Sequence, residues 1–258
     1  MTQYKLLYHS GGNVPKLSEV GFRCYSQHEE DGILLFIFSL IGTTNKRCVE
    51  ICAGDGIECN TANLILNHRW IGILFDGNEA NTRKAKHFYS SHPDSQYWPP
   101  TIVHHWITKH NINSLLSANG FTGDIDLLSL DVDGVDYWLW KELSIVSPRV
   151  VVLEFNHLWG PERSVTVPYS DEFVGNFTSY GSDYAGASLS AFIRLGRVKG
   201  YRFIGTNAIA TNAFFVRQDI ACDWLPEAKP GDCFDHPRAR FGMEQRLRGV
   251  QNREWLEV

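Results

Sequence analysis

Two stretches of the sequence decide the fold: RCVEICAGDG at residues 47–56 and GILFD at residues 72–76. Each starts with a short apolar run, and the runs end in a glycine-rich turn and in an acidic residue. Small residues let a turn bend sharply and approach a ligand, and an acid after the second run can accept two hydrogen bonds from ribose hydroxyls. Twenty residues separate Gly56 from Asp76, about the spacing that this geometry requires. The pair predicts a nucleotide-binding β-α-β unit.

The composition of the turn favours one kind of nucleotide. The pattern is Glu50-x-Cys52-x-Gly54-x-Gly56 instead of G-x-G-x-x-G, and Asp55 lies inside it. A dinucleotide site places a pyrophosphate at the N-terminus of the next helix, and carboxylates there would repel it. S-adenosylmethionine carries a sulfonium, an amino group and a ribose, so it suits the turn better than NAD. The alternative is a glycine turn that binds nothing.

Composition and charge exclude several classes of protein. With 258 residues, 43% of them hydrophobic, the chain can bury the core of a single α/β domain. The net charge of −5 and pI near 6.0 provide no basic footprint for nucleic acid. No apolar run is long enough to span a membrane, and the first residues do not resemble a secretory signal. We expect a cytoplasmic protein whose partner is a small molecule, with neither nucleic acid nor membrane as a partner; homo-oligomer formation stays open.

The hydrophobic pattern predicts an alternation of strands and helices. Continuous apolar runs such as residues 125–130 indicate strands covered on both faces, as in a parallel sheet. The last two expected strands are too close in sequence for a crossover and predict an antiparallel hairpin. The expected strands are residues 48–52, 70–75, 101–106, 125–130, 149–155, 201–205 and 213–217, and the expected helices are 27–41, 59–67, 79–90, 138–143 and 188–199. The fold class is therefore α/β and Rossmann-like: a mostly parallel seven-stranded sheet with a C-terminal antiparallel hairpin and helices on both faces, the architecture of class I methyltransferases.

Three segments divide the chain. Residues 1–24 form a polar N-terminal extension, residues 25–220 form the main domain, and residues 221–258 form an arginine-rich C-terminal tail. An insertion loop at about residues 156–181 interrupts the main domain, and loops of this length are usually functional. The tail is read as a lid, an oligomer arm or a solvated helix. The six cysteines include no C-x-x-C pair, and we expect Cys48, Cys52 and Cys59 to be buried reduced thiols and not metal ligands.

The sequence resembles the FkbM-like S-adenosylmethionine-dependent methyltransferases. The matching pieces are residues 25–32 (YSQHEEDG), 50–56, 59–61, 72–76, 125–134 and 151–155. The turn departs from the family pattern, because Cys52 stands at the first glycine. Ser129 replaces a family lysine in the K-x-D-x-E-G pattern, and Asp133 keeps its second acid.

The resemblance implies a cofactor site in the turn. It implies contacts at Glu50, Gly54 and Gly56, and ribose recognition by Asp76. Gln27 and Asn60 lie beside the turn and are expected near the methionine end of the cofactor, although helix capping explains Asn60 equally well. The full predicted cofactor site is Gln27, Glu50, Gly54, Asp55, Gly56, Asn60, Asp76 and Gly77.

Polar side chains also follow the fourth and fifth expected strands. Asp131, Asp133, Glu154 and Asn156 are hard oxygen donors at neighbouring strand ends and could together hold Mg²⁺, which would lower the pKa of an attacking hydroxyl. Alternatively, no metal binds and Asp131 or His157 acts as general base. Both readings stay open, with Asp131 and His157 as the catalytic candidates.

The insertion loop supplies a predicted acceptor pocket. Trp159, Tyr169 and Tyr184 could stack on a ring, and Arg163 could pair with an acidic group; equally, these side chains could anchor the loop. The predicted function is methylation of a small molecule, best matched by O-methylation of a sugar or specialised-metabolite hydroxyl. The alternatives are an N-methyltransferase of an amine or amino-acid-like acceptor, a non-catalytic protein that binds S-adenosylmethionine, and a dinucleotide enzyme.

Overall fold

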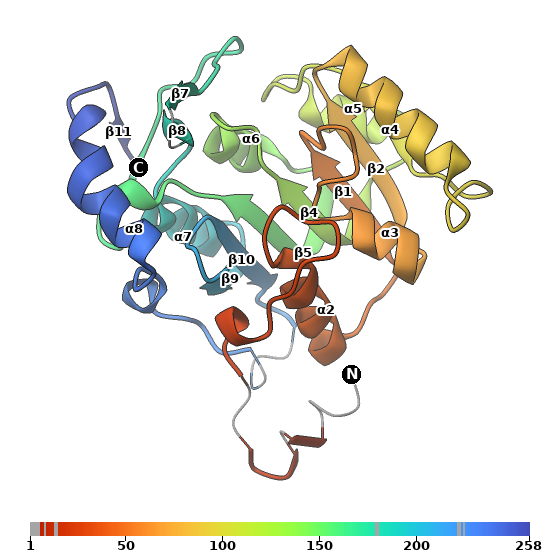
Figure 1. Cartoon of the computed structure of the whole chain (residues 1–258), viewed down its shortest axis with the longest axis horizontal. Coiled ribbons are helices and arrows are strands. Elements are labelled where there is room, and N and C mark those ends of the chain that lie inside the picture. Colours follow the sequence, from red (N-terminus) through yellow and green to blue (C-terminus); the bar gives the residue numbers. More distant parts are fainter. Residues whose placement is uncertain (1–5, 8, 13–14, 179–180, 221–222, 224) are drawn as a thin grey trace.

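A seven-stranded sheet forms the centre of the molecule (Figure 1). The computed structural model describes residues 6–7, 9–12, 15–178, 181–220, 223 and 225–258, so Cys222 lies outside the described residues. The strand order is β3-β2-β1-β4-β5-β10-β9, and only β10 runs antiparallel to its neighbours. The strands are β1 (Arg47–Ile51), β2 (Ile71–Asp76), β3 (Thr101–His104), β4 (Gly123–Leu130), β5 (Val146–Glu154), β9 (Tyr201–Thr206) and β10 (Asn212–Arg217). The predicted fold class is confirmed: it is α/β and Rossmann-like, with a mostly parallel seven-stranded sheet that ends in a C-terminal antiparallel hairpin.

Helices cover both faces of the sheet because alternate strand residues point to opposite sides. Val49 and Ile51 of β1 belong to one core, whereas Cys48 belongs to the other. One face is covered by α2 (Glu30–Ile41), α3 (Ala62–His68) and α4 (Glu79–Ser91), and the other by α5 (Ile112–Ala118), α6 (Asp136–Glu142) and α7 (Leu189–Val198). The two cores hold the sheet from both sides, as the continuous apolar runs predicted.

Several helices differ from the sequence prediction. Helix α3 begins at Ala62 and not at Cys59, because the backbone N–H of Thr61 donates to Glu50 of β1 (2.8 Å). The first helix, α2, begins at Glu30 and not near Gln27, because the Asp31 carboxylate accepts hydrogen bonds from the backbone N–H groups of Cys24, Tyr25 and Ser26 (2.7, 2.7 and 2.8 Å) and holds them in a loop. Helix α5 was not predicted, because only two of its seven residues are buried and its apolar pattern is therefore too short to read.

The insertion and the tail contain more structure than the sequence predicted. The insertion contains a turn of 3-10 helix (His157–Trp159), β6 (Val165–Thr166) and β7 (Asn176–Thr178), and it leads into β8 (Gly181–Tyr184). The tail contains α8 (Pro237–Phe241), a π-helical turn (Gly242–Arg246) and β11 (Leu256–Glu257), which pairs antiparallel with β6. Short 3-10 turns occur at Leu17–Glu19, Pro230–Cys233 and Leu247–Gly249. Because β6 and β11 are far apart in sequence and each is two residues long, no local pattern could predict their pairing.

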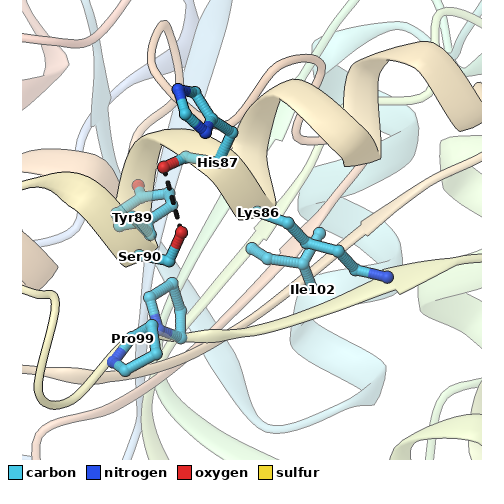
Figure 2. Close-up of a pocket in the computed structure, with 7 residues that line it drawn as sticks. Lys86, His87, Tyr89, Ser90, Pro99 and Ile102 are labelled. Carbon is cyan, nitrogen blue, oxygen red and sulfur yellow. Dashed lines mark hydrogen bonds between the residues drawn. The ribbon is translucent and has the colours of Figure 1, made fainter.

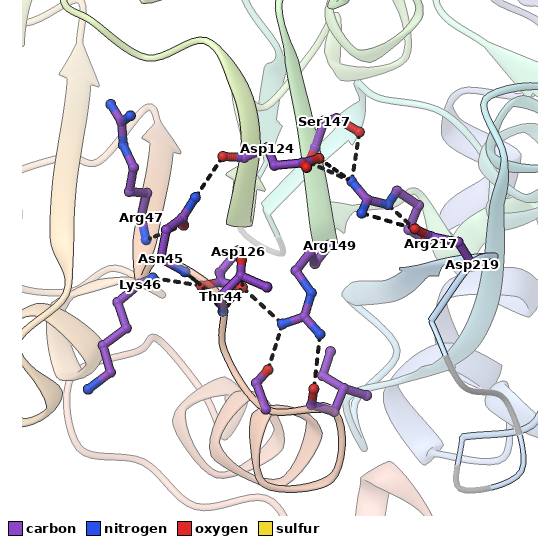
Figure 3. Close-up of polar contacts among 12 residues, drawn as sticks. Thr44, Asn45, Lys46, Arg47, Asp124, Asp126, Ser147, Arg149, Arg217 and Asp219 are labelled. Atoms are coloured by element: carbon purple, nitrogen blue, oxygen red, sulfur yellow. Dashed lines mark hydrogen bonds and ion pairs between the residues drawn. The ribbon is translucent and has the colours of Figure 1, made fainter.

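A buried ion pair ties the first helix to the sheet, at the strand ends opposite the carboxyl edge (Figure 3). Arg149 donates to Asp126 (2.9 Å) and to the carbonyls of Gly42 and Ile41, where α2 ends. This contact sets the position of α2 on the sheet. In the described part of the chain, no helix combines the length and apolar character needed to cross a membrane.

Candidate functional site

The strand order reverses beside β1, which matters for the carboxyl edge of the sheet. The chain leaves β1 for β2 and β3 on one side, and then returns to β4 on the other side of β1. Open α/β sheets bind ligands where the strand order reverses in this way. The backbone N–H of Asp131, just after β4, donates to the Ile51 carbonyl at the end of β1 (3.4 Å). The glycine turn and the acidic segment after β4 therefore lie side by side.

Three residues of the turn after β1 have left-handed backbone conformations. Their φ angles are +66° at Cys52, +57° at Gly54 and +73° at Gly56. Only glycine adopts this region without strain, which explains why the family pattern has glycine where this chain has Cys52. A Cβ on Gly54 would meet nothing within 4 Å, whereas a Cβ on Gly56 would lie 2.9 Å from Ala85 Cβ. Gly54 thus leaves open space for a ligand, and Gly56 lets α4 pack closely.

Cys52 also departs from the expectation for the cysteines. Cys48 and Cys59 are buried free thiols, but Cys52 is exposed, with its Sγ 3.9 Å from Asp76 Oδ2. Desolvation and the nearby carboxylates, first Asp76 and then Asp131, raise the pKa of Cys52, so this thiol stays protonated. The left-handed turn directs Cys52 toward the carboxyl edge and away from the core.

Asp76 ties the turn to the end of β2. Its Oδ2 accepts from Gly54 N and its Oδ1 accepts from Asn78 N, both at 2.8 Å. Longer contacts to Asn81 Nδ2 (3.3 Å) and the Cys52 thiol (3.9 Å) complete its surroundings, and the residue is 5% exposed. Ribose recognition by Asp76 stays a prediction.

Glu50 lies behind the turn, in a buried polar network. Its carboxylate accepts from Thr61 N (2.8 Å) and Ser129 Oγ (2.7 Å), and Ser129 in turn accepts from Asn60 Nδ2 (3.0 Å). Burial raises the pKa of Glu50 to about 7, against the hydrogen bonds that lower it. Glu50 and Asn60 therefore join α3 to β1 and β4, and their direct contact with a cofactor stays a prediction.

The remaining polar residues of the predicted cofactor site lie nearer to solvent. Asp55 is half-buried in the turn, and its Oδ1 accepts from Ile57 N (3.1 Å). Gln27 is exposed in the loop that Asp31 shapes before α2. Both positions leave the side chain accessible to a ligand.

Gly77 brings a tryptophan to the site that the sequence did not predict. A Cβ on Gly77 would lie 2.7 Å from the Trp106 ring, so glycine allows this ring to cover the end of β2. Trp106 follows β3, is 51% exposed, and donates from Nε1 to the Asp171 carbonyl (2.7 Å). The only sequence signal for Trp106 is its place just after a strand, where ligands bind in this class of fold.

Asp131, Asp133 and Glu154 form an acid group at the ends of β4 and β5. One carboxylate oxygen from each lies within 4.8 Å of the others, and all three side chains are half-buried. The Asp131 and Glu154 carboxylates are close enough to perturb each other. Burial, followed by repulsion from Asp136 and Asp133, raises the pKa of Asp131. Burial and Asp131 likewise raise the pKa of Glu154. A bound divalent cation would remove this repulsion.

Asp136 shapes the loop that carries the acid group. Its carboxylate accepts from Val132 N (2.8 Å) and Gly134 N (3.0 Å), and the residue is 1% exposed. Burial raises the pKa of Asp136 to about 6. The backbone of Asp133 has a φ of +51°, a strained conformation that these hydrogen bonds support.

Asn156, the fourth predicted metal ligand, is directed into the insertion. Its Oδ1 accepts from Leu158 N (3.0 Å), and its Nδ2 donates to the carbonyls of Asp183 (3.1 Å) and Ala185 (2.9 Å). The whole amide is thus committed to the insertion, and its role as a ligand stays a prediction.

His157 is buried under the tail. A Cβ on Gly242 would lie 2.6 Å from His157 Nε2, and the described residues offer that nitrogen no hydrogen-bond partner. Burial, together with the charges of Arg246 and Arg238, lowers the pKa of His157 to about 4, so the ring is neutral at pH 7. Only 7% of the residue is exposed, which leaves its predicted catalytic role without an observed path to an acceptor.

Three of the four predicted acceptor residues contact the tail. Trp159 and Tyr184 both pack edge-on against Trp255, and Arg163 forms an ion pair with Glu257. These contacts match the anchoring alternative, and substrate contact by the three stays a prediction.

Tyr169 lies apart from this cluster. Its hydroxyl donates to the Asp171 carboxylate and accepts from Lys109 N (3.0 Å), and Lys109 Nζ lies 4.1 Å from the ring centroid. Trp106 also contacts Asp171, so Tyr169 belongs to the segment that approaches the end of β2. Phe173 of the same segment lies against Gly134, beside the acid group.

A separate pocket lies between α4 and β3 (Figure 2). Its volume is about 430 Å³, and it is lined by Lys86, His87, Tyr89, Ser90, Pro99, Pro100 and Ile102. None of the predicted site residues lines it, so it is not part of the site at the carboxyl edge.

Comparisons with known proteins add solved structures of similar fold. No protein-family model and no curated protein matches the sequence. The magnesium protoporphyrin IX methyltransferase of Synechocystis PCC 6803, solved with S-adenosylmethionine, is 12% identical, with 73% of this chain and 77% of that chain covered and a TM-score of 0.44. The glycopeptide N-methyltransferase MtfA, solved with S-adenosylhomocysteine, is 12% identical, with 78% and 95% covered and a TM-score of 0.47. The N-terminal domain of EvdMO1, solved with S-adenosylhomocysteine, is 14% identical, with 84% and 95% covered and a TM-score of 0.46. Because these TM-scores are below 0.5, any functional conclusion must rest on the site itself.

Proposed function

We propose that this protein is an S-adenosylmethionine-dependent methyltransferase that acts on a small molecule. One observation carries the proposal: the glycine turn, Asp76 and the acid group of Asp131, Asp133 and Glu154 all meet at the single reversal of strand order. The proposed nucleoside site would therefore lie next to a group of proton acceptors, as methyl transfer to a polar atom requires.

The negative charge around the glycine turn supports a cationic cofactor. Asp55 and Asp76 border the turn, and the acid group lies directly beside it. Such a field disfavours the pyrophosphate of a dinucleotide and suits a sulfonium and an amino group. Open space beside Gly54, where a Cβ would touch nothing, leaves room for the ligand.

Each group of residues has a distinct proposed role. Bound S-adenosylmethionine would supply an electrophilic methyl group. Asp76 would hold the ribose hydroxyls, and the backbone at Gly54 would let the ligand approach the sheet. Asp131, whose pKa burial and neighbouring acids raise, would accept the proton that the acceptor hydroxyl loses as its oxygen bonds to the methyl carbon. Alignment of donor and acceptor would account for much of the remaining rate.

In the alternative version of the proposal the acid group holds a divalent cation, and Asp131 is then a ligand and not the base. Asp131, Asp133 and Glu154 offer hard oxygen donors within reach of one another, the ligand type that Mg²⁺ prefers. Bound Mg²⁺ would lower the pKa of an acceptor hydroxyl. The finer parts of the proposal are membership of the FkbM-like group, O-methylation of a sugar or metabolite hydroxyl, and a cytoplasmic location.

Calorimetric titration tests whether the protein binds the proposed cofactor. We expect micromolar binding of S-adenosylmethionine and S-adenosylhomocysteine and no binding of NAD. Release of S-adenosylhomocysteine is then measured over panels of hydroxyl and amine acceptors. Turnover of amines alone would favour N-methylation, and cofactor binding without any turnover would favour a binding protein. Absence of cofactor binding would refute the proposal.

A further inference from the structure

Two polar residues, Glu154 of β5 and Asn212 of β10, lie next to the apolar core on the face of the sheet that α2 and α3 cover. Val152 of β5 and Phe214 of β10 pair in register on this face, and both are buried. The next pair on the same face is Glu154 and Asn212, which are directly opposite each other. In antiparallel strands, the Cβ atoms of opposite residues lie about 4.5–5.5 Å apart on one face. The Asn212 side chain therefore lies beside a member of the acid group.

The Asn212 amide nitrogen has a hydrogen-bond partner, whereas the amide oxygen has none among the described residues. Its Nδ2 donates to Glu30 Oε1 (2.9 Å), which identifies the opposite end of the amide as the oxygen. This Oδ1 is buried, and within the described part of the chain it has no hydrogen-bond partner. The whole residue is only 5% exposed. A buried amide oxygen without a donor is costly, so it indicates a ligand that supplies a positive charge or a donor.

Contacts around Glu30 hold Asn212 in place. Glu30 is fully buried, and its Oε1 also accepts from Asn207 Nδ2 (2.7 Å), while its Oε2 accepts from His28 N (3.0 Å). The Asn207 Oδ1 accepts from the backbone N–H of Asn212 (3.1 Å). Both the backbone and the amide of Asn212 are thus fixed before any ligand arrives, as a preorganised ligand atom requires.

We propose that Asn212 Oδ1 is a fourth protein ligand of a divalent cation at the acid group, and that Glu30 is its positioning residue. The inference rests on the cation site of the proposed function and adds a residue from β10 to it. Three carboxylates and one amide oxygen form the all-oxygen ligand set that suits Mg²⁺ or Mn²⁺. The sequence suggested an asparagine ligand at Asn156, but the sheet places Asn212 directly opposite Glu154.

The test is Mn²⁺ binding by the full chain, followed by the electron paramagnetic resonance signal of free Mn²⁺. Asn212→Ala removes the oxygen and should weaken Mn²⁺ binding at least tenfold. Asn212→Leu keeps the branched shape of the side chain without its oxygen, so it should weaken Mn²⁺ binding as the alanine variant does. Val216→Ala is the matched control, because it alters the same strand, β10, at a position paired with Val150 and away from Glu154. Melting by circular dichroism and S-adenosylhomocysteine calorimetry accompany every variant.

Each outcome bears on one proposal. Equal Mn²⁺ affinity in the natural chain and in Asn212→Ala would overturn the inference, and Asn212→Leu decides the case in the same way if the alanine variant does not fold. If the natural chain binds S-adenosylhomocysteine but no Mn²⁺, the cation inference fails and the methyltransferase proposal stands. If it binds Mn²⁺ but no S-adenosylhomocysteine, the methyltransferase proposal fails, while the ligand set is still tested by the variants.

Discussion

Asp126→Ala is expected to lower the free energy of unfolding by about 3–5 kcal/mol. Asp126 lies in the first half of β4 and is completely buried. Its carboxylate accepts from the backbone N–H groups of Thr44, Asn45 and Lys46, with N–O distances of 2.7–3.0 Å, and from Arg149 Nη1 at 2.9 Å (Figure 3). The alanine would leave three N–H groups and a buried guanidinium without this acceptor.

The magnitude follows from what is left unpaired. A buried donor without a partner costs about 1–3 kcal/mol, and breaking a buried ion pair from one side costs about 3–5 kcal/mol. These costs overlap because one carboxylate serves all the donors, so they are not summed. A domain has about 5–15 kcal/mol of total stability, which makes the expected loss large.

The pH dependence of this contribution has a defined sign. Burial raises the pKa of Asp126, but hydrogen bonds from Thr44 N and Arg149 outweigh it, and the net pKa lies below the ordinary value of 3.8. The stabilisation is therefore fully present above pH about 4 and is lost as the pH falls through the folded-state pKa.

Urea unfolding at pH 7, followed by circular dichroism and tryptophan fluorescence, measures the effect. The control is Asp124→Ala, two residues earlier on the same strand. The Asp124 side chain is 68% exposed and pairs with Arg217 at the surface, so its loss should cost less than about 1 kcal/mol. Equal losses for both variants, or a loss below 1 kcal/mol for Asp126→Ala, would refute the reasoning.

Three further predictions concern the turn and its surroundings. The folded-state pKa of Glu50 is raised from 4.5 to about 7, so its contribution to stability is full below pH 4.5 and is lost as the pH rises through 7. Glu50→Gln should therefore have a free energy of unfolding up to about 3 kcal/mol higher than the natural chain at pH 8, and little higher at pH 5. Urea unfolding that gives parallel pH curves for the two proteins would contradict this. Gly56→Ala brings a Cβ to 2.9 Å from Ala85 Cβ in a left-handed turn, whereas the Cβ of Gly54→Ala meets nothing within 4 Å. Gly54→Ala should lower the free energy of unfolding by about 1–2 kcal/mol through backbone strain, and Gly56→Ala should lower it more. Thermal melts that rank the two variants in reverse would contradict the packing argument. Asp76→Ala should weaken S-adenosylhomocysteine binding by about 1–3 kcal/mol in calorimetry, and an unchanged affinity would remove Asp76 from the cofactor site.

The elements that could be predicted are those whose signal is local. β4 and β5 are continuous apolar runs, and a strand covered on both faces needs no distant partner to be recognised. The end of α2 at Gly42 has the same local character, because Gly42 has a φ of +66° after an apolar helix. Helix α5 lacked such a signal, since only Ile112 and Leu116 are buried.

The candidate site was partly predictable for the same reason. Parallel strands end at one edge of the sheet, so the acids that follow β4 and β5 had to come close together, and carboxylate oxygens of Asp131 and Glu154 lie within 4.8 Å of each other there. The sequence could not show that Asn156 turns into the insertion or that Trp106 covers Gly77. Side-chain direction depends on neighbours that only the packed chain supplies.

By itself, the sequence determined the order of the seven strands in the main sheet and of most helices, the glycine turn after β1 and the edge at which the acids gather. All of these follow from apolar runs, glycine positions and the geometry of parallel strands. Only the tertiary structure decided which residues meet across the sheet. Asn212 faces Glu154 because β10 inserts antiparallel beside β5, and β11 pairs with β6 because the tail returns over the insertion. Strand register between distant segments depends on the packing of the whole core, and no local pattern encodes it.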